Sequence, residues 1–183
     1  LIAQMMQMIA PFNVEKMGLN TLASVNLMVE SQRRAYADRA EHMGDPDYWK
    51  VPTKTLISNS YAKARMSDYK EGVAGSSKII VAGEAHESEQ TTHFSVIDKE
   101  GNMVAITTTL NDTYGNKTIV AGAGFLLNNE MDDFSVKPGV PNMYGALGGE
   151  ANSIQPGKRM LSSMTPTLVT VKGKPYISIG TPG

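Results

Sequence analysis

The chain has 183 residues, of which 41% are hydrophobic and 19% charged, and its net charge is −1. These values are typical of a folded globular protein and exclude disordered and fibrous classes, while the absence of a basic run argues against nucleic-acid binding. With no cysteine, the sequence has no disulfide framework, no thiol nucleophile and no zinc-binding cysteine cluster. No apolar run approaches the roughly 20 residues of a membrane-spanning helix.

The first part of the chain carries helical signals. Residues 1–10 have the apolar character of a helix interior and lack the features of a leader peptide, so we expect an interior piece of a larger protein. A long amphipathic helix is predicted over 22–43, with Asn20 as its N-cap and Gly44 just past its end. Its apolar positions are Leu22, Val25, Met28, Val29, Ala35 and Ala40.

A turn is predicted at 45–47, because Pro46 disfavours a helical conformation at the residue before it. A further helix is predicted from Ser58 or Asn59 to about Tyr69. Residues 70–90 are rich in glycine, serine and charged side chains, which predicts a mostly flexible connector.

The remainder of the chain shows β patterns. Helices followed by strands favour an α+β protein, and we expect one structural domain with a helical region 1–90 and a β-rich region 91–183. Irregular loops are expected between the second strand and about residue 160. The predicted strands are 91–98, 103–110, 166–171 and 175–179, with hairpin turns at 99–102 and 172–174.

Thr91 is a candidate nucleophile at the start of the first strand. A hydroxyl needs a neighbouring base, and an N-terminal threonine carries one in its own α-amine, whose reference pKa is about 7.7–8.0. This chemistry requires cleavage between Gln90 and Thr91, because a peptide nitrogen is not a base; the uncleaved chain is therefore expected to be a zymogen. On residue types alone, the segment 91–95 is better explained as an ordinary strand than as a nucleophile site.

Several downstream blocks resemble the small subunit of γ-glutamyltranspeptidases. The blocks are Leu126-Leu127-Asn128-Asn129-Glu130-Met131-Asp132-Asp133-Phe134, Lys137-Pro138-Gly139-Val140-Pro141-Asn142, Lys158-Arg159-Met160-Leu161-Ser162-Ser163-Met164-Thr165-Pro166-Thr167 and Gly180-Thr181-Pro182-Gly183. Upstream, residues 35–40 and 44–46 look like the end of the large subunit of that family. The resemblance implies that this chain supplies part of a four-layer αββα N-terminal nucleophile (Ntn) hydrolase fold.

The resemblance also implies an activity. After autocatalytic cleavage before Thr91, such an enzyme transfers γ-glutamyl groups from glutathione and related compounds to water or to amino-acid and peptide acceptors, without a cofactor. It further implies that the remainder of the same polypeptide completes the active site and that the protein is periplasmic or extracellular. Exposed sheet edges would also allow copies of the chain to pair as homo-oligomers.

Site residues follow from the same resemblance, position by position. Thr109 matches the threonine that orients the nucleophile, and Gly183 matches the first of two oxyanion-hole glycines. The second glycine and a carboxylate-binding arginine fall outside this sequence, so we expect the chain by itself to be inactive. The substrate's α-amino group is matched by Asn111, Glu130 and Asp133, and its α-carboxylate by Ser162 and Ser163.

The residues alone leave other interpretations open. Thr109 is also an ordinary β-branched strand residue, Glu130 and Asp133 are also typical solvated loop charges, and a serine pair often forms a turn or helix cap. An acylase of the cephalosporin acylase type would use the same nucleophile with another acyl pocket. A non-catalytic interaction module is the alternative from a different class.

The three histidines do not suggest a metal centre. His42, His86 and His93 lack ligand spacing. His86 is interpreted as part of a solvated connector, and His93 as a structural or maturation-site neighbour of Thr91.

Overall fold

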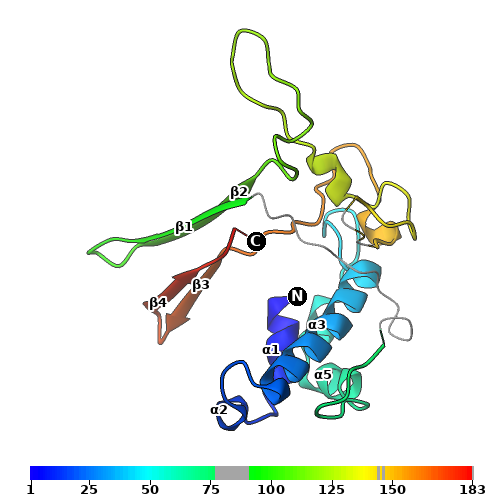
Figure 1. Ribbon diagram of the computed structural model, residues 1–183, viewed down its shortest axis with the longest axis vertical. Helices are drawn as coiled ribbons and strands as arrows, with labels where there is room; N and C mark the ends of the chain where they lie inside the picture. The colour runs from blue at the N-terminus through cyan, green and yellow to red at the C-terminus, as the bar shows by residue number, and fades with distance from the viewer. Residues whose placement is uncertain (77–90, 144, 146, 183) are drawn as a thin grey trace. The chain divides into compact units, whose positions relative to one another are not determined.

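The computed structural model describes residues 1–76, 91–143, 145 and 147–182, and combines helices with antiparallel hairpins (Figure 1). This mixture confirms the α+β class. The expected four-layer architecture concerns the whole protein and stays a prediction. The elements are α1 (Ile2–Ile9), α2 (Val14–Met17), α3 (Leu22–His42), α4 (Thr53–Leu56), α5 (Asn59–Arg65), β1 (Thr91–Ile97), β2 (Met103–Thr109), the 3₁₀ helices η1 (Glu130–Asp133) and η2 (Glu150–Asn152), β3 (Thr167–Val171) and β4 (Lys174–Ile179).

The described residues form two compact units. The helical unit lies within Leu1–Ala85 and Ser135–Arg159, and the strand unit within His86–Phe134 and Met160–Gly183. Residues 135–159, which the sequence placed in the β-rich region, pack with the helices instead. Long-range backbone contacts account for this difference, because the Gly149 N–H donates to the Ala40 carbonyl at 2.9 Å and η2 packs on α3.

The helical unit has a small apolar core. Met8 from α1, Leu27 from α3, and Ala62 and Met66 at the end of α5 are buried together. Phe12 and Tyr69 pack against this core, and their rings contact each other edge-to-face with the centroids 5.3 Å apart. None of the helices in the described ranges is long and apolar enough to cross a membrane.

Helix α3 begins at a different cap from the one expected. Thr21 is the N-cap: its Oγ1 accepts from the Ser24 N–H at 3.3 Å, and the Ser24 hydroxyl accepts from the Thr21 N–H at 3.0 Å. Asn20 lies one residue earlier with a φ of 55°. A reciprocal Thr–Ser pair satisfies two otherwise unpaired donors, so it decides the helix start. The α5 start was predicted correctly at its Ser58 cap, but the helix ends at Arg65 rather than near Tyr69.

The buried face of α3 combines apolar residues, Leu27, Ala35 and Ala37, with charged ones. Four of the expected apolar positions, Leu22, Val25, Met28 and Val29, are at least 42% exposed. The buried positions include Glu30, Arg34 and Asp38, which are paired: Arg34 bonds Glu30 and Asp68, and Asp38 bonds Gln4 and Arg65. Buried charges are tolerated when paired in this way, and the residues Glu30, Arg34, Asp38 and Asp68 are called the charge ladder below. Of the expected apolar positions, Ala35 is fully buried as predicted, whereas the four nearer the start of α3 are not.

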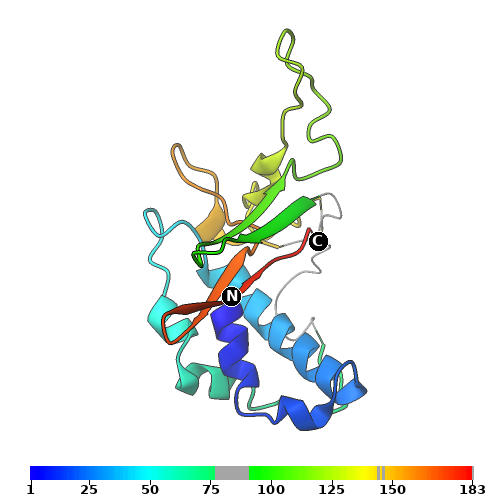
Figure 2. The same cartoon turned by 90° about the vertical axis from the view of Figure 1, so that its left-hand side faces the viewer.

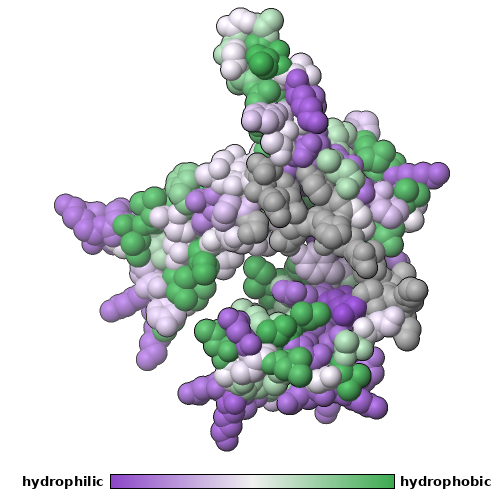
Figure 3. Space-filling view, in the orientation of Figure 1, coloured by the Kyte–Doolittle hydropathy of each residue, from purple (hydrophilic) through white to green (hydrophobic). Residues whose placement is uncertain are grey.

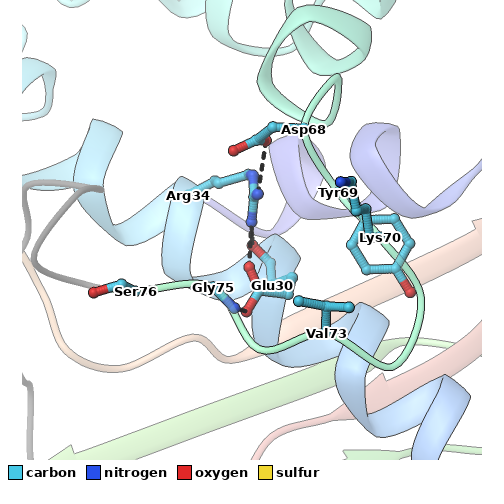
Figure 4. A pocket seen from close by; sticks show the side chains of 8 residues that line it. All are labelled: Glu30, Arg34, Asp68, Tyr69, Lys70, Val73, Gly75 and Ser76. Carbon is cyan, nitrogen blue, oxygen red and sulfur yellow. Dashed lines mark hydrogen bonds and ion pairs between the residues drawn. The ribbon is translucent and has the colours of Figure 1, made fainter.

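The charge ladder also holds the chain that follows α5 (Figure 4). The Arg34 guanidinium lies between Glu30, at 2.5 Å, and Asp68, at 2.8 Å, and the Gly75 N–H donates to Glu30 Oε1 at 2.8 Å. Burial opposes ionisation of Glu30, but the hydrogen bonds from Arg34 and Gly75 and the nearby guanidinium charges outweigh it and hold the pKa of Glu30 below its usual value. These residues line a small pocket of about 140 Å³.

The strand unit consists of two hairpins in contact (Figures 1 and 2). Strands β1 and β2 are antiparallel, with Thr91 opposite Thr109 and Ile97 opposite Met103. The β3–β4 hairpin turns at Lys172 and Gly173, whose φ values of 51° and 75° suit a tight two-residue turn. All four strands were predicted to within one residue.

The first hairpin has two different faces. Thr91, His93 and Ser95 share one face of β1 because side chains alternate along a strand. The opposite face carries apolar side chains that remain 42–52% exposed, and hydrophobic surface is visible around the strands in Figure 3. The residues of this apolar face are Phe94, Val96, Val104 and Ile106.

Candidate active site

Thr91 and Thr109 lie directly opposite one another at one end of the β1–β2 hairpin. Directly opposed residues in an antiparallel pair have Cβ atoms about 4.5–5.5 Å apart, so the two hydroxyl groups share one edge of the sheet. Thr109 Oγ1 accepts from the Asn111 N–H at 2.9 Å. The structure thus brings the expected nucleophile and its expected orienting residue together.

The chain leaves β2 through a strained, buried residue. Asn111 is 3% exposed and has a φ of 74°, and its side-chain Nδ2 donates to the Asn129 carbonyl at 3.2 Å. Asparagine tolerates this left-handed conformation better than most residues. A residue expected to bind substrate is therefore fixed immediately after Thr109, at the same end of the hairpin.

Asn129 clamps the loop that contains Asn111. Its N–H donates to the Leu110 carbonyl at 3.1 Å, and its Oδ1 accepts from the Asp112 N–H at 2.9 Å. These bonds join two segments that are about 18 residues apart in sequence, and so carry Glu130, the next residue, to the end of β2. No role was predicted for Asn129 from the sequence. Its position beside Glu130, in the block Asn128–Asp133, is the feature that could have indicated one.

Glu130 and Asp133 form a pair of carboxyl groups in η1. Residues three apart eclipse one another on a 3₁₀ helix, which places the two side chains on one side. Burial, followed by the negative charge of Asp133 and a hydrogen bond with it, raises the pKa of Glu130 to about 7. Two adjacent carboxyls resist double ionisation, so Glu130 is about half protonated at pH 7 and the pair suits a cation such as an ammonium group.

The serine pair has a local arrangement. Ser162 and Ser163 are exposed, and the Ser162 hydroxyl accepts from the Met164 N–H at 3.0 Å and donates to the Met164 carbonyl at 3.3 Å. These bonds correspond to the turn that residue types alone suggest. Carboxylate binding by Ser162 and Ser163 stays a prediction.

The segment before the serine pair is anchored in the helical unit by Arg159. Its backbone N–H and its Nε donate to Asp45 Oδ2 at 2.8 and 2.9 Å, and a terminal nitrogen donates to Oδ1 at 2.5 Å. The side-chain bonds from Arg159, followed by its backbone bond, hold the pKa of Asp45 well below its usual range. Two motifs that are 114 residues apart in sequence are joined by this ion pair.

Other expected positions fall elsewhere. Gln90, Gly183, His86 and most of the expected connector at 70–90 lie outside the described residues. His93, which was interpreted as a neighbour of the maturation site, bonds Thr107 and Ser95. Over the described ranges, no group of three or more histidine, cysteine, aspartate or glutamate side chains could hold a metal ion.

A family model described as gamma-glutamyltranspeptidase matches residues 1–183. The glutathione hydrolase proenzyme of Escherichia coli is 46% identical over 184 residues, which cover 100% of this chain and 32% of that protein. The acylase ACY 1 proenzyme of a Pseudomonas species is 34% identical over 187 residues, covering 100% of this chain and 30% of that protein. The chain therefore spans about a third of the length of these curated relatives.

Two solved structures are similar to part of the chain. A mutant γ-glutamyltranspeptidase of Helicobacter pylori has 58% sequence identity and a TM-score of 0.45, over 46% of this chain and 46% of that chain. The γ-glutamyltranspeptidase of Pseudomonas nitroreducens complexed with L-DON has 61% identity and a TM-score of 0.45, over 46% of this chain and 44% of that chain.

Proposed function

We propose that this chain, which belongs to the γ-glutamyltranspeptidase family, contains the nucleophile and the amino-acid pocket of a γ-glutamyl-transferring enzyme. The donor is glutathione or a related γ-glutamyl compound, and the acceptor is water or the amine of an amino acid or peptide. The observation that carries this proposal is the pairing of Thr91 with Thr109 at the hairpin end that leads into Asn111, which the Asn129 clamp joins to Glu130.

Maturation is the first step. The Thr91 hydroxyl attacks the Gln90 carbonyl carbon, the Gln90–Thr91 C–N bond breaks, and an ester links Gln90 to Thr91 Oγ1. Water then hydrolyses the ester, which leaves a carboxylate on Gln90 and a free α-amine on Thr91. The relatives named proenzymes support this order of events.

Turnover reuses the same hydroxyl. The free α-amine of Thr91 accepts the Oγ1 proton as the oxygen attacks the γ-carbonyl carbon of the substrate. The proton then passes to the departing amine, and a γ-glutamyl ester remains on Thr91. Attack by water releases glutamate, whereas attack by an acceptor amine forms a new γ-glutamyl amide. The Thr109 hydroxyl, already accepting from Asn111, is suited to donate to Thr91 Oγ1 and orient it.

The pocket recognises the amino-acid end of the γ-glutamyl group. Asn111, Glu130 and Asp133 hold the α-ammonium through charge-assisted hydrogen bonds, and Ser162 and Ser163 bind the α-carboxylate. Gly183 supplies an oxyanion donor, which typically contributes about 100–1,000-fold in rate. The remainder of the polypeptide supplies the second glycine and an arginine.

An acylase is the second candidate, because a relative named as an acylase is 34% identical over the whole chain. The Glu130–Asp133 pair favours the γ-glutamyl activity. An acyl group without an α-ammonium would leave this carboxyl pair without a cationic partner, and burial of unpaired charge is costly.

Location and assembly are extensions of the same proposal. We propose a periplasmic or extracellular protein, supported by the family resemblance, which can form homo-oligomers through exposed sheet edges. The exposed apolar face of the β1–β2 hairpin supports packing against the remainder of the polypeptide.

Mass spectrometry of the full-length protein tests the proposal. We expect a new N-terminus at Thr91 and hydrolysis of a γ-glutamyl amide, both abolished by Thr91→Ala. Thr92→Ala is the matched control and should retain both, because Thr92 points to the opposite face of β1. Hydrolysis by a protein that still has an intact Gln90–Thr91 bond would contradict the mechanism.

A further inference from the structure

His93 occupies the same face of β1 as Thr91, two residues along the strand, or about 6.6 Å away. Its Nδ1 lies 2.7 Å from the Thr107 hydroxyl and its Nε2 lies 3.0 Å from the Ser95 hydroxyl. A hydroxyl can donate or accept, so both bonds are compatible with either neutral tautomer and with the imidazolium. The ring is thus held at both nitrogens whatever its protonation state.

The backbone of Gly180 rests on this imidazole. A Cβ atom added to Gly180 would lie 2.5 Å from Nδ1 and 2.8 Å from Nε2 of His93, and closer still to Cε1. Real Cβ atoms do not approach other atoms so closely, so residue 180 has no space for a side chain. Close approach of the backbone is a recognised reason for glycine. The ring therefore sets how near β1 the chain can come as it leaves β4.

Gly180 begins the irregular segment that continues through Thr181 and Pro182, and the next residue in the sequence is the one proposed as the oxyanion donor. A shift of this segment relative to β1 is therefore expected to change how the proposed donor approaches the carbonyl attacked by Thr91. Displacement of a reacting group by about 1 Å can cost about 100-fold in rate. A support under Gly180 thus has kinetic consequences although it touches no substrate.

We propose that His93 is a positioning residue that supports the segment 180–182 relative to Thr91. This inference rests on the proposed function for its kinetic consequence. His93 moves no proton in the reaction; its two nitrogens are occupied by Thr107 and Ser95, and its contribution is the thickness and fixed orientation of the ring.

Kinetics of the matured full-length protein test the proposal. His93→Ala should lower kcat roughly 10- to 100-fold with little change in KM, because the residues proposed to hold the amino-acid end lie on other segments. His93→Asn should recover part of the loss, since its amide can still bond Thr107. His42→Ala, which removes an imidazole from the end of α3, is the control and should leave kcat unchanged.

A double-mutant cycle makes the test specific. Gly180→Ala should lower kcat at least as strongly as His93→Ala, because the new Cβ collides with the ring. Combining the two changes should give a higher kcat than Gly180→Ala alone, because removing the ring makes room. A double mutant no better than Gly180→Ala would overturn the proposal, as would a kcat for His93→Ala within twofold of wild type.

Two further readouts distinguish a positioning role of His93 from proton transfer by its imidazole. Loss of an ionisation from the kcat–pH profile in His93→Ala, without recovery in His93→Asn, would indicate proton transfer and contradict a positioning role. Thermal unfolding of the same variants tests the contact without turnover: the double mutant should melt at a higher temperature than Gly180→Ala. An inactive wild-type protein that shows this unfolding pattern would contradict the proposed function but support the His93–Gly180 contact.

Discussion

Glu130 is a residue whose environment changes its chemistry. Burial and the neighbouring Asp133 raise its pKa to about 7, so the carboxyl is protonated below that pH and ionised above it. An ammonium ligand is attracted to the ionised pair, and this attraction offsets the free energy needed to deprotonate Glu130. Binding of a cation should therefore strengthen as the pH rises through 7. Titration of the ligand's own ammonium group would have the opposite effect, because that group loses its charge as the pH rises.

The pH dependence of amino-acid binding is a direct prediction from this shift. The inhibition constant of L-glutamate should fall about tenfold between pH 6 and pH 8, since the ionised fraction of a group with a pKa near 7 rises about tenfold. Glu130→Gln should bind weakly with an inhibition constant that is flat over this range. Asp132→Asn removes a carboxylate two residues from Glu130 in η1. It is the control and should keep the wild-type profile.

A competitive inhibitor binds without proton transfer to the α-amine of Thr91, so its pH dependence reports on the pocket and not on the chemical step. If Glu130→Gln retained the tenfold change, another group would titrate in the pocket, and the assignment of Glu130 to the ammonium would be wrong.

At the scale of elements, local periodicity predicted the strands and the long helix, but it did not predict the N-cap of α3 or most of its buried side chains. The alternation of side chains predicted β1 to β4, and with the turn signals it placed Thr91 and Thr109 on paired strands. Apolar spacing predicted α3 and its buried Ala35, but not the exposure of Leu22 and Val25 or the burial of Glu30 and Arg34. Hydrophobic periodicity predicts which face of a helix packs on an apolar core. It carries no information about ion-pair partners such as Asp68, which lies 34 residues from Arg34.

The Asp45–Arg159 ion pair is an anchor between elements, and its effect should depend on pH. A depressed folded-state pKa of Asp45 contributes stability above its unfolded value of about 3.9, and that contribution is lost as the pH falls through the lower folded value. Arg159→Ala should therefore lower the melting temperature at pH 7, and the difference from wild type should narrow below about pH 4.

Arg159→Lys is the matched variant for this anchor. Lysine keeps the charge but cannot reach both oxygens with a planar fork, so we expect a melting temperature between those of Arg159→Ala and wild type. A difference between wild type and Arg159→Ala that is equally large at pH 7 and pH 3 would show that Arg159 stabilises through packing rather than through Asp45.

At the scale of the whole molecule, the structure collects the candidate site in one unit. Thr91, Thr109, Asn111 and the Glu130–Asp133 pair all belong to the strand unit, as does the serine pair. The sequence placed these residues through family resemblance, because residue types alone describe ordinary strand, loop and turn positions. The Asn129 clamp was not predictable from periodicity, since it consists of side-chain and backbone bonds between two irregular segments.

The return of residues 135–159 to the helical unit was likewise outside the reach of local patterns. It depends on close backbone approaches, such as Gly44 against Ala151, where an added Cβ would collide with the carbonyl group. Glycines in irregular segments read as turns in a sequence. Only the folded chain shows that Gly44 and Gly149 are contact points between distant segments.

The central claim is that the hydroxyl of an N-terminal Thr91 carries the γ-glutamyl group during turnover. The most direct measurement is rapid acid quenching of the matured full-length protein with a γ-glutamyl amide, followed by intact-mass and peptide mapping. We predict one γ-glutamyl group on the hydroxyl of Thr91 in a fragment whose first residue is Thr91. A γ-glutamyl adduct on a different residue, or sustained turnover by protein in which Gln90 and Thr91 remain joined, would contradict the account.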